Sequence, residues 1–288
     1  MAELQRSDFR CLHRLRVRWA DVDMQKIVFT AHYLMYFDTA VTDYWRAVAL
    51  PYESAMHQLG GDIYVAKATV EFHASARMDD MLEVGMKCSR IGNSSLAFTG
   101  AIFRGEEHLI SGELIYVFAD PATQRSQPVP QALRDILLGY EAGEPVFSVR
   151  TGGWTELGPE ASRIRTEVFV QEQGIAREVE LDEADATAVH ALAVNRLGQP
   201  LATGRLVTGE PGVGKIGRMA VSRVMRGSQI GAAVLQALLS AARNRGDHEV
   251  CLHAQRSAVG FYRRMGFEAR GEPFIEAGIE HLKMVTRL

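Results

Sequence analysis

The sequence predicts an α+β chain of two domains: an antiparallel sheet wrapped on a central helix, followed by a mixed α/β sheet. The 288 residues exceed the usual size of one domain, and 47% of them are apolar, enough for two cores. One apolar helical run precedes several strand-like segments in the first half, whereas strands and helices alternate in the second. The segment 139–145, with two glycines and a proline, separates the halves. The predicted domains are therefore 1–143 and 144–288.

The first half opens with a predicted strand and a predicted helix. Leu15, Val17 and Trp19 alternate with arginines, the period-two pattern of a strand with one buried face. Residues 32–50 are apolar almost all round, and a helix of that kind must be nearly engulfed by its surroundings. Pro51 is expected to end this helix.

The rest of the first half is predicted to form strands and a short helix. Short polar links separate the last three strands, which indicates antiparallel hairpins. A helix at 131–140 begins after Pro130. The predicted strands are 63–73, 81–91, 96–104 and 108–118.

The second half alternates strands and helices without an internal repeat. The run 230–245 carries its apolar residues at helical spacing. The other predicted helices are 159–170 and 258–265. The predicted strands are 146–150, 191–195, 201–207, 215–221 and 250–253.

Composition argues against several classes of function. A formal charge of −3 and a pI near 6.3 give no basic footprint, so no nucleic-acid partner is expected. The N-terminal residues lack the apolar core of a secretory signal, and no run approaches the ~20 apolar residues of a spanning helix, so no membrane partner is expected. Cys11, Cys88 and Cys251 are isolated, which predicts reduced thiols in a cytoplasmic protein without a metal site.

Asp23 is the first candidate catalytic residue. It lies where the predicted strand gives way to the predicted helix, so its carboxylate is expected near the N-terminal amides of that helix. Such amides can polarise a thioester carbonyl while the carboxylate attacks it or activates water. Aspartate is also a favoured turn and N-cap residue, and the residues alone favour that structural role.

Residues 16–46 resemble the hotdog-fold acyl-CoA thioesterases of the 4-hydroxybenzoyl-CoA type. The segment 21–29, DVDMQKIVF, is similar to that family's turn, D-x-D-x-x-G-I-V-[FWY], which precedes its central helix. The resemblance extends in strand order over roughly the first 140 residues. It implies a hotdog domain that hydrolyses acyl-CoA with Asp23 as the catalytic carboxylate. It also implies a homodimer or higher homo-oligomer, with the site built across the interface.

Two positions depart from that family's pattern. Lys26 stands where the family usually has glycine, and Thr30 where many relatives have tyrosine or histidine. The lysine either shapes the mouth of the pocket, pairs with a CoA phosphate, or marks a site that has lost hydrolysis. His32, at the predicted helix start, is interpreted as a substrate-binding pocket residue, with helix capping as an equal alternative.

A second candidate site begins at 226–232, RGSQIGA. Small residues stand where a loop becomes a helix, so the backbone can wrap closely around an anion. The helix dipole favours a pyrophosphate there, and Arg226 adds positive charge. Glycines at helix starts are common, so the loop by itself is also compatible with a plain helix cap.

Together with the strand at 215–221 and the segment 258–267, AVGFYRRMGF, this loop resembles the acyl-CoA site of GNAT acyltransferases. Gln229 replaces the middle glycine of the family's loop, [RQ]-x-x-G-x-[GA], a departure shared by the ElaA-like subgroup. A wider pattern is also ElaA-like and extends the resemblance over nearly all of 146–288: Arg165, Val168, Phe169, Val170, Glu172, Gln173, Asp182, Asp185, His190, Gly217, Arg218, Phe274, Glu276, Gly278, Ile279 and His281.

The GNAT resemblance implies a role for each part of the site, with acetyl-CoA or another acyl-CoA as substrate and no metal. The backbone of Met219, Ala220 and Val221 is expected to receive the pantetheine arm like an added strand. Tyr262 is expected to protonate the departing thiolate as general acid, with simple aromatic packing as the alternative. The pyrophosphate is expected to be held by Arg226, Gly227, Gln229, Ile230, Gly231 and Ala232.

The general base that deprotonates an amine acceptor is not singled out by spacing. Glu172, His190, His253 and His281 are candidates by residue type, and a water chain is a further alternative. Glu172 is also assigned to substrate binding. The acidic run 178–185 would steer a cationic amine toward the site, although most such runs are solvated loops.

The sequence therefore predicts a bifunctional acyl-CoA enzyme. An N-terminal hotdog domain hydrolyses the thioester, and a C-terminal GNAT domain transfers an acyl or acetyl group from CoA to an amine. The alternative is an active GNAT domain beside a degenerate hotdog domain that serves dimerisation or acyl-CoA binding, which Lys26 and Thr30 keep open. A pure assembly scaffold requires both sites to be inactive, and Asp23 and Tyr262 argue against it.

Overall fold

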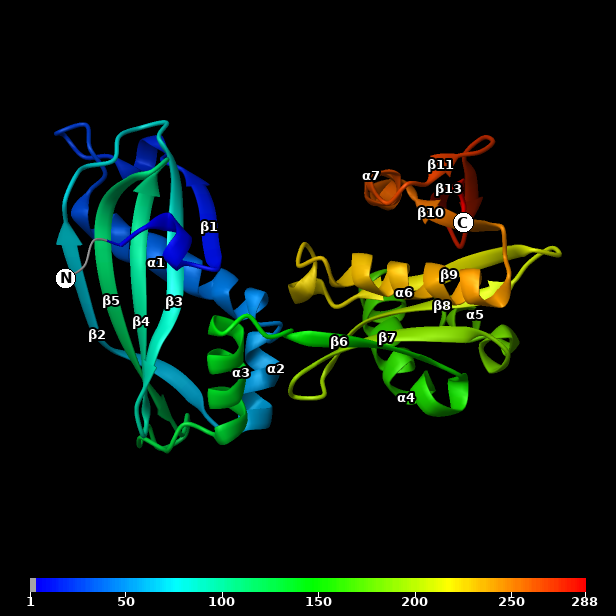
Figure 1. Ribbon diagram of the computed structural model, residues 1–288, viewed down its shortest axis with the longest axis horizontal. Coiled ribbons are helices and arrows are strands. Elements are labelled where there is room, and N and C mark those ends of the chain that lie inside the picture. Colours follow the sequence, from blue (N-terminus) through cyan, green and yellow to red (C-terminus); the bar gives the residue numbers. More distant parts are fainter. Residues whose placement is uncertain (1–3) are drawn as a thin grey trace. The chain divides into compact units, whose positions relative to one another are not determined.

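The computed structural model describes residues 4–288 and divides the chain into two compact units, the first ending at Val146 and the second spanning Phe147–Leu288 (Figure 1). Each unit contains a sheet of its own. Within residues 4–288, no helix is both long enough and apolar enough to cross a membrane.

The first unit is an antiparallel sheet packed on one long helix, α1 (Thr30–Ala47). The strand order is β1-β3-β4-β5-β2, and each neighbouring pair is antiparallel. Two shorter helices, α2 (Tyr52–Leu59) and α3 (Gln131–Glu141), belong to the same unit. The strands are β1 (Cys11–Arg16), β2 (Asp62–Phe72), β3 (Met81–Ile91), β4 (Ser95–Arg104) and β5 (Glu107–Ala119).

A pair of glycines lets α1 approach the sheet. Gly100 of β4 and Gly112 of β5 lie opposite each other, and the fully buried ring of Phe37 rests on both. A Cβ atom on Gly100 would lie 2.5 Å from that ring, and one on Gly112 would lie 2.6 Å from it. Both distances are shorter than van der Waals contact, so any larger residue would push the helix off the sheet.

The helix is less engulfed than its composition predicts. Leu34 and Met35 are 39% and 41% exposed, so one stripe of α1 faces away from the core of its own unit. The helix also ends at Ala47, before the predicted end at residue 50, and Ala49 adopts a left-handed φ of 57°. The following helix α2 was not predicted from the sequence.

The predicted first strand is too long at its C-terminal end. Its ladder with β3 stops at the pair Arg16 and Met81, because β3 begins there, and the backbone of Val17 bonds instead to the turn before β3, at Asp79 and Asp80. Val17 is buried as expected, but Trp19 opens a short 3₁₀ turn and is 80% exposed. The alternating pattern therefore continues for three residues beyond the strand itself.

The predicted linker also begins too early. Gly139 and Tyr140 are buried residues of α3, and the helix continues to Glu141. The Glu141 carboxylate accepts hydrogen bonds from the Tyr44 hydroxyl at 2.6 Å and from the Cys88 backbone N–H at 2.9 Å. Residues 139–141 therefore help to hold the first unit together, and the connecting segment begins after them.

This contact predicts how the chain tolerates cutting. A first piece of residues 1–143 is expected to fold, and so is a second piece of residues 144–288. A piece that ends at residue 138 should melt at a clearly lower temperature, because it leaves Tyr44 and Cys88 without the Glu141 carboxylate. Circular dichroism melts of the two N-terminal pieces make the comparison, and equal melting temperatures would contradict it.

The second unit is a mixed sheet covered by helices. The path through the sheet is β11-β13-β10-β9-β8-β7-β6, with β12 paired to β13. Only β9 and β10 are parallel neighbours. The strands are β6 (Phe147–Gly152), β7 (Val189–Asn195), β8 (Pro200–Thr208), β9 (Val213–Val221), β10 (Glu249–Gln255), β11 (Glu268–Ala269), β12 (Phe274–Glu276) and β13 (Ile279–Arg287).

Most helices of the second unit follow the predictions. The helix α6 (Ile230–Arg245) has the predicted bounds, and α7 (Val259–Arg264) is slightly shorter than predicted. The helix predicted at 159–170 is in fact α4 (Trp154–Arg165), which runs directly into a π-helical segment, Thr166–Glu172. The short helix α5 (Arg177–Glu180) and the C-terminal strand β13 were not predicted.

The strands β9 and β10 are paired only along their first halves. Their parallel ladder ends at Ile216 and Leu252. Beyond this point β9 stays paired with β8 as far as Val221, whereas β10 pairs with β13 as far as Gln255. A β-bulge in β9, with Arg218 at a φ of 53°, falls just past the end of the ladder. Two strands are thus left unpaired on the sides that face each other.

Candidate active sites

The turn before α1 is anchored by Asp21 rather than by Asp23. The buried Asp21 carboxylate accepts hydrogen bonds from the Arg18 backbone N–H at 2.8 Å and from the Arg18 guanidinium at 2.9 Å. Burial opposes ionisation of this group, but the hydrogen bonds from Arg18 lower the pKa of Asp21 below its ordinary value. Asp21 is therefore a structural carboxylate.

Asp23 lies half-buried in the same turn. One of its carboxylate oxygens accepts a hydrogen bond from the Gln25 backbone N–H at 2.8 Å. Its own backbone N–H donates to the Ile27 carbonyl at 2.9 Å, and its carbonyl accepts from Lys26 at the same distance. Lys26 adopts a φ of 63°, the left-handed region that favours glycine. The lysine thus adopts a left-handed backbone conformation at the position where the thioesterase pattern has glycine.

His32 holds this turn from the first part of α1. Its ring nitrogen Nδ1 lies 2.9 Å from the Asp21 backbone carbonyl. A carbonyl only accepts, so Nδ1 carries the proton and donates. Thr30 is the first residue of the helix. The contact shows that His32 fixes the turn, whereas the start of α1 has no side-chain cap, so the capping alternative is not seen. The substrate-binding role of His32 stays a prediction, with Nε2 as the atom that would meet a ligand.

The second unit contains a cavity of about 450 Å³ beside the unpaired parts of β9 and β10. Met219 lines it from β9, His253 and Gln255 line it from β10, and Tyr262 reaches it from α7. Tyr262 is 7% exposed, and burial raises the pKa of its hydroxyl to about 12. The hydroxyl therefore keeps its proton at neutral pH, as a general acid must.

The predicted pyrophosphate loop lies past the end of β9 and does not line this cavity. Gly227 and Gln229 have φ values of 88° and 64°, and α6 begins directly after them. A Cβ atom on Gly231 would lie 3.1 Å from the Val221 side chain, which is tight. Ile230 is buried, so only its backbone can face a ligand. The loop therefore presents backbone and small residues, including Ala232.

Glu172 is engaged by Arg226. The two side chains form two hydrogen bonds, Nη1 to Oε1 at 2.7 Å and Nη2 to Oε2 at 2.6 Å. This pairing lowers the pKa of Glu172 and raises that of Arg226. Glu172 therefore lies beside the loop at the start of α6 and does not line the cavity that holds Tyr262.

The four candidate bases are separated by the fold. His253 and His281 line the same cavity as Tyr262. His190 is buried elsewhere, with Nε2 at 3.0 Å from the Asp185 backbone carbonyl and its ring against Trp154. Geometry therefore favours the two cavity histidines over His190 and over the arginine-paired Glu172.

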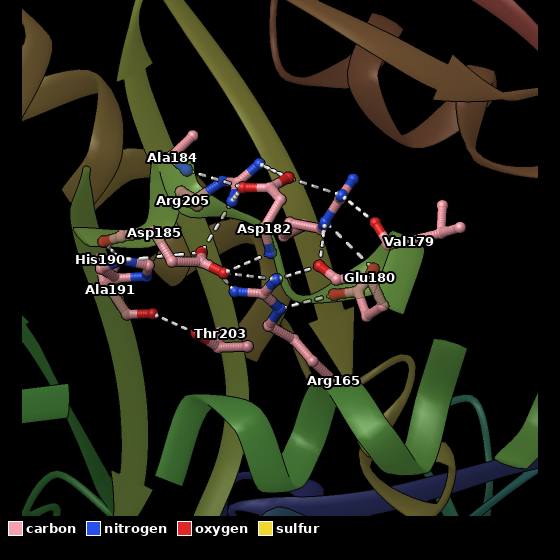
Figure 2. A network of polar contacts seen from close by, with 11 residues as sticks. Arg165, Val179, Glu180, Asp182, Ala184, Asp185, His190, Ala191, Thr203 and Arg205 are labelled. Atoms are coloured by element: carbon pink, nitrogen blue, oxygen red, sulfur yellow. Dashed lines mark hydrogen bonds and ion pairs between the residues drawn. The ribbon is translucent and has the colours of Figure 1, made fainter. Parts of the chain in front are cut away.

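Part of the acidic run 178–185 is engaged by arginines, whereas Glu178 and Glu183 are exposed (Figure 2). Glu180 and Asp185 are 3% and 2% exposed, and both receive hydrogen bonds from Arg165, which is itself 1% exposed. Two further arginines complete the network, because Arg205 binds Asp182 and Asp185 while Arg218 binds Glu180 and Asp182. The charges of Glu180, Asp182 and Asp185 are therefore compensated inside the domain.

Removal of Arg165 is expected to destabilise the second unit strongly. Arg165→Met leaves Glu180 and Asp185 buried without their main partner, a change that costs about 3 to 5 kcal/mol of unfolding free energy. Without the arginine both carboxyls take up protons more readily in the folded than in the unfolded state, so the deficit should shrink as the pH falls. Chemical denaturation at pH 8 and pH 5 measures both effects.

Arg163→Met on the same helix is the matched control. Arg163 is exposed, so this change is expected to shift the unfolding free energy by no more than about 0.5 kcal/mol. Equal stabilities of the two variants would show that the network contributes nothing to the fold.

Sequence reasoning missed two polar arrangements. One is the pairing of His253 with Glu276, whose residues it named separately. The other lies on β5 of the first unit, where the Ser111 hydroxyl lies 2.9 Å from Nε2 of His73 and 3.2 Å from that of His108. Both depend on strand pairing between distant segments, which no local spacing reveals.

Comparison with known proteins matches the two units to two different families. Residues 17–137 match the model of the thioesterase-like superfamily, and residues 158–288 match that of the acetyltransferase (GNAT) domain. The Escherichia coli protein YbgC, named as an acyl-CoA thioester hydrolase, is 30% identical over 120 residues, which cover 41% of this chain and 89% of YbgC.

Two further relatives match the second unit. The Bacillus subtilis protein YjcF, named as an uncharacterized N-acetyltransferase, is 35% identical over 127 residues, which cover 44% of this chain and 89% of YjcF. A crystal structure of an acyl-CoA N-acyltransferase from Pseudomonas aeruginosa is 32% identical, with a TM-score of 0.44, and covers 48% of this chain and 98% of that one. The chain is therefore a fusion that belongs to the thioesterase-like superfamily through its hotdog domain and to the GNAT acetyltransferases through its second domain.

Proposed function

We propose that the chain is a bifunctional acyl-CoA enzyme that hydrolyses one acyl thioester and transfers another acyl group to an amine. The observation that carries the proposal is the presence of Asp23 and Tyr262 at separate sites in one chain. The relatives of the two domains are named as an acyl-CoA thioester hydrolase and an N-acetyltransferase. Water and an amine are then the two acceptors of the same class of substrate.

Hydrolysis is assigned to the turn before α1. Hydrogen bonds within the turn fix the Asp23 carboxylate, and His32 fixes the turn from the helix. The carboxylate attacks the thioester carbonyl or activates water, and backbone N–H groups at the start of α1 stabilise the oxyanion. Lys26 is exposed at this turn and offers a cation to a CoA phosphate.

Acyl transfer is assigned to the cavity of the second unit. The backbone of Met219, Ala220 and Val221, which has no partner strand on the side of β10, accepts the pantetheine arm. The loop at the start of α6 binds the pyrophosphate. The thioester then lies near Tyr262, whose proton is retained at neutral pH and passes to the departing thiolate.

We also propose that the enzyme works in the cytoplasm as a homodimer or higher homo-oligomer joined through the hotdog domain. The strand β2 is an edge of its sheet, and Val65 and Phe72 on it are 56% and 52% exposed. A long, exposed, apolar edge strand favours pairing with another chain. The exposed side chains of Trp19, Met24 and Phe29 surround the Asp23 turn and favour the same conclusion. All three cysteines are free thiols, which suits a reducing compartment.

Thiol release measured over a panel of acyl-CoAs, with and without amines, tests this proposal. Release without an amine reports hydrolysis, and additional release with an amine reports transfer. A chain that binds acyl-CoA but releases thiol only with an amine would instead support a hotdog domain that serves assembly or binding. A chain that releases no thiol under either condition would contradict the proposal.

A further inference from the structure

We propose that His253 is the general base of the acyl transfer and that Glu276 positions it, a proposal that rests on the transferase function assigned above. The two side chains come from different parts of the chain, His253 from β10 and Glu276 from β12. The hairpin of β12 and β13 brings them together, because β13 pairs with both β10 and β12.

The hydrogen bond between the two residues fixes the tautomer of the imidazole. Nδ1 of His253 lies 2.8 Å from the Glu276 carboxylate. Burial works against ionisation of that carboxyl, but the hydrogen bond from His253 lowers the pKa of Glu276, so it is a carboxylate at neutral pH. A carboxylate only accepts, so Nδ1 carries a proton, and the tautomer with this contact has its lone pair on Nε2. This is the form that a base requires.

The ring is also held in place by packing. Phe274 contacts it edge-on, with ring centroids 4.8 Å apart. The His253 side chain nevertheless remains 28% exposed, and it lines the cavity that Tyr262 also lines. A proton acceptor and a proton donor therefore share one cavity next to the proposed path of the pantetheine arm.

The other charged groups near His253 do not replace it. His281 lines the cavity from β13, but its Nδ1 lies 2.8 Å from the Ile279 carbonyl and its ring stacks on Phe274. The charge of His281 also helps to lower the pKa of Glu276, but its Nδ1 contacts the Ile279 carbonyl and not that carboxylate. Lys215 lines the cavity from β9, and its charge helps to lower the pKa of Glu276, so it complements the carboxylate and does not replace the histidine. Among the described residues that line this cavity, His253 is the histidine whose ring nitrogen is hydrogen-bonded to a carboxylate.

The resulting step is balanced in protons and electrons. A neutral amine nitrogen forms a bond with the thioester carbonyl carbon and gives one proton to Nε2 of His253. The C–S bond breaks, and the sulfur takes the bonding electrons and the proton of the Tyr262 hydroxyl. The products are an amide and a free CoA thiol, and the proton on His253 replaces the one that Tyr262 lost. An ammonium substrate first gives its extra proton to Nε2 of His253, which passes it to solvent before the attack.

Amine acceptors that differ in basicity test whether His253 is the general base. With acetyl-CoA and ethylamine or benzylamine, His253→Gln is expected to lower the transfer rate by about 100-fold or more. With methoxyamine or aniline, which are already neutral at pH 7, the loss should be much smaller, because little proton removal is needed before attack. A merely structural role would lower the rates with all four amines equally.

The matched control is His281→Gln. It removes the other histidine of the cavity. It should leave the ratio of the transfer rates with strongly and weakly basic amines unchanged. If His281→Gln changes that ratio of rates and His253→Gln does not, the assignment of His253 as the base is overturned. A wild-type chain that transfers to none of the four amines overturns the transferase function and the base together, whereas an active wild type with an unaffected His253→Gln overturns the base alone.

Glu276 is tested as a positioning residue by two readouts. Glu276→Gln removes the counter-charge of the imidazolium, so the acidic limb of the rate profile should move to lower pH, and Glu276→Asp should restore part of it. Nitrogen NMR of the His253 ring should show Nδ1 protonated in the wild type and a mixture of tautomers in Glu276→Gln. An unchanged tautomer and an unchanged pH profile would overturn the positioning role.

Discussion

Tyr262→Phe is expected to lower amine-dependent turnover by about 100- to 10,000-fold while CoA affinity stays nearly constant. The phenyl ring fills the same buried space against Phe267, but it has no proton to give to the departing thiolate. The loss should ease with acyl donors whose thiol is more acidic, because such a thiolate leaves without protonation. Steady-state rates and calorimetric titration with CoA measure the two quantities on the same protein.

Phe261→Leu is the control for packing around that tyrosine. Phe261 contacts the Tyr262 ring, with centroids 5.0 Å apart, and its replacement keeps the hydroxyl. A small effect of Phe261→Leu beside a large effect of Tyr262→Phe assigns the loss to the proton. Near wild-type turnover in Tyr262→Phe would instead mean that the reaction takes its proton from another donor.

Asp23→Asn is expected to abolish hydrolysis in the absence of amines, with a decrease of at least about 100-fold. Asparagine keeps the shape of the side chain and the oxygen that accepts the Gln25 N–H, so the turn should survive. The same protein should retain amine-dependent transfer, which verifies that the chain is folded. Thiol release with and without an amine measures both activities.

Asp120→Asn is the matched control for the hydrolase prediction. Asp120 accepts a hydrogen bond from the backbone N–H two residues ahead, at Ala122, as Asp23 does at Gln25. The two turns are alike in this contact, but Asp120 lies between β5 and α3, away from the start of α1. Full hydrolysis in Asp23→Asn would reduce Asp23 to the same turn-forming role and would favour the binding-module alternative.

The order of the elements and both fold families were predictable because their causes are local. The bounds of α6 and β3 follow from an apolar period and from the polar residues or glycines beside them. The comparisons confirm the hotdog and GNAT assignments made from two short motifs. The error at Trp19 has a different cause, since a strand ends where its partner ends and the alternating pattern does not record that position.

The missing parts of the candidate sites all depend on contacts between distant segments. The pairing of His253 with Glu276 requires β13, and this strand was not predicted from the sequence of residues 279–287. The sequence did not reveal the ion pairs within the acidic run, because the arginines that bind Glu180, Asp182 and Asp185 lie on α4, β8 and β9. The roles of Asp23 and Tyr262 remain predictions, because a turn and a packed aromatic ring are also what an inactive site would contain.

Lys26 and Gln229 stand at the apex of the two turns on which the chemistry is proposed to depend, and both have a φ near 60°. A glycine there would give the same backbone path with no side chain. Each turn instead carries a long polar side chain, which ends in an ammonium group at Lys26 and in an amide at Gln229. The backbone of such a site can therefore stay fixed while a substitution at this one position changes its selectivity for the distal part of a substrate. A non-glycine residue in this left-handed conformation costs about 1 to 2 kcal/mol.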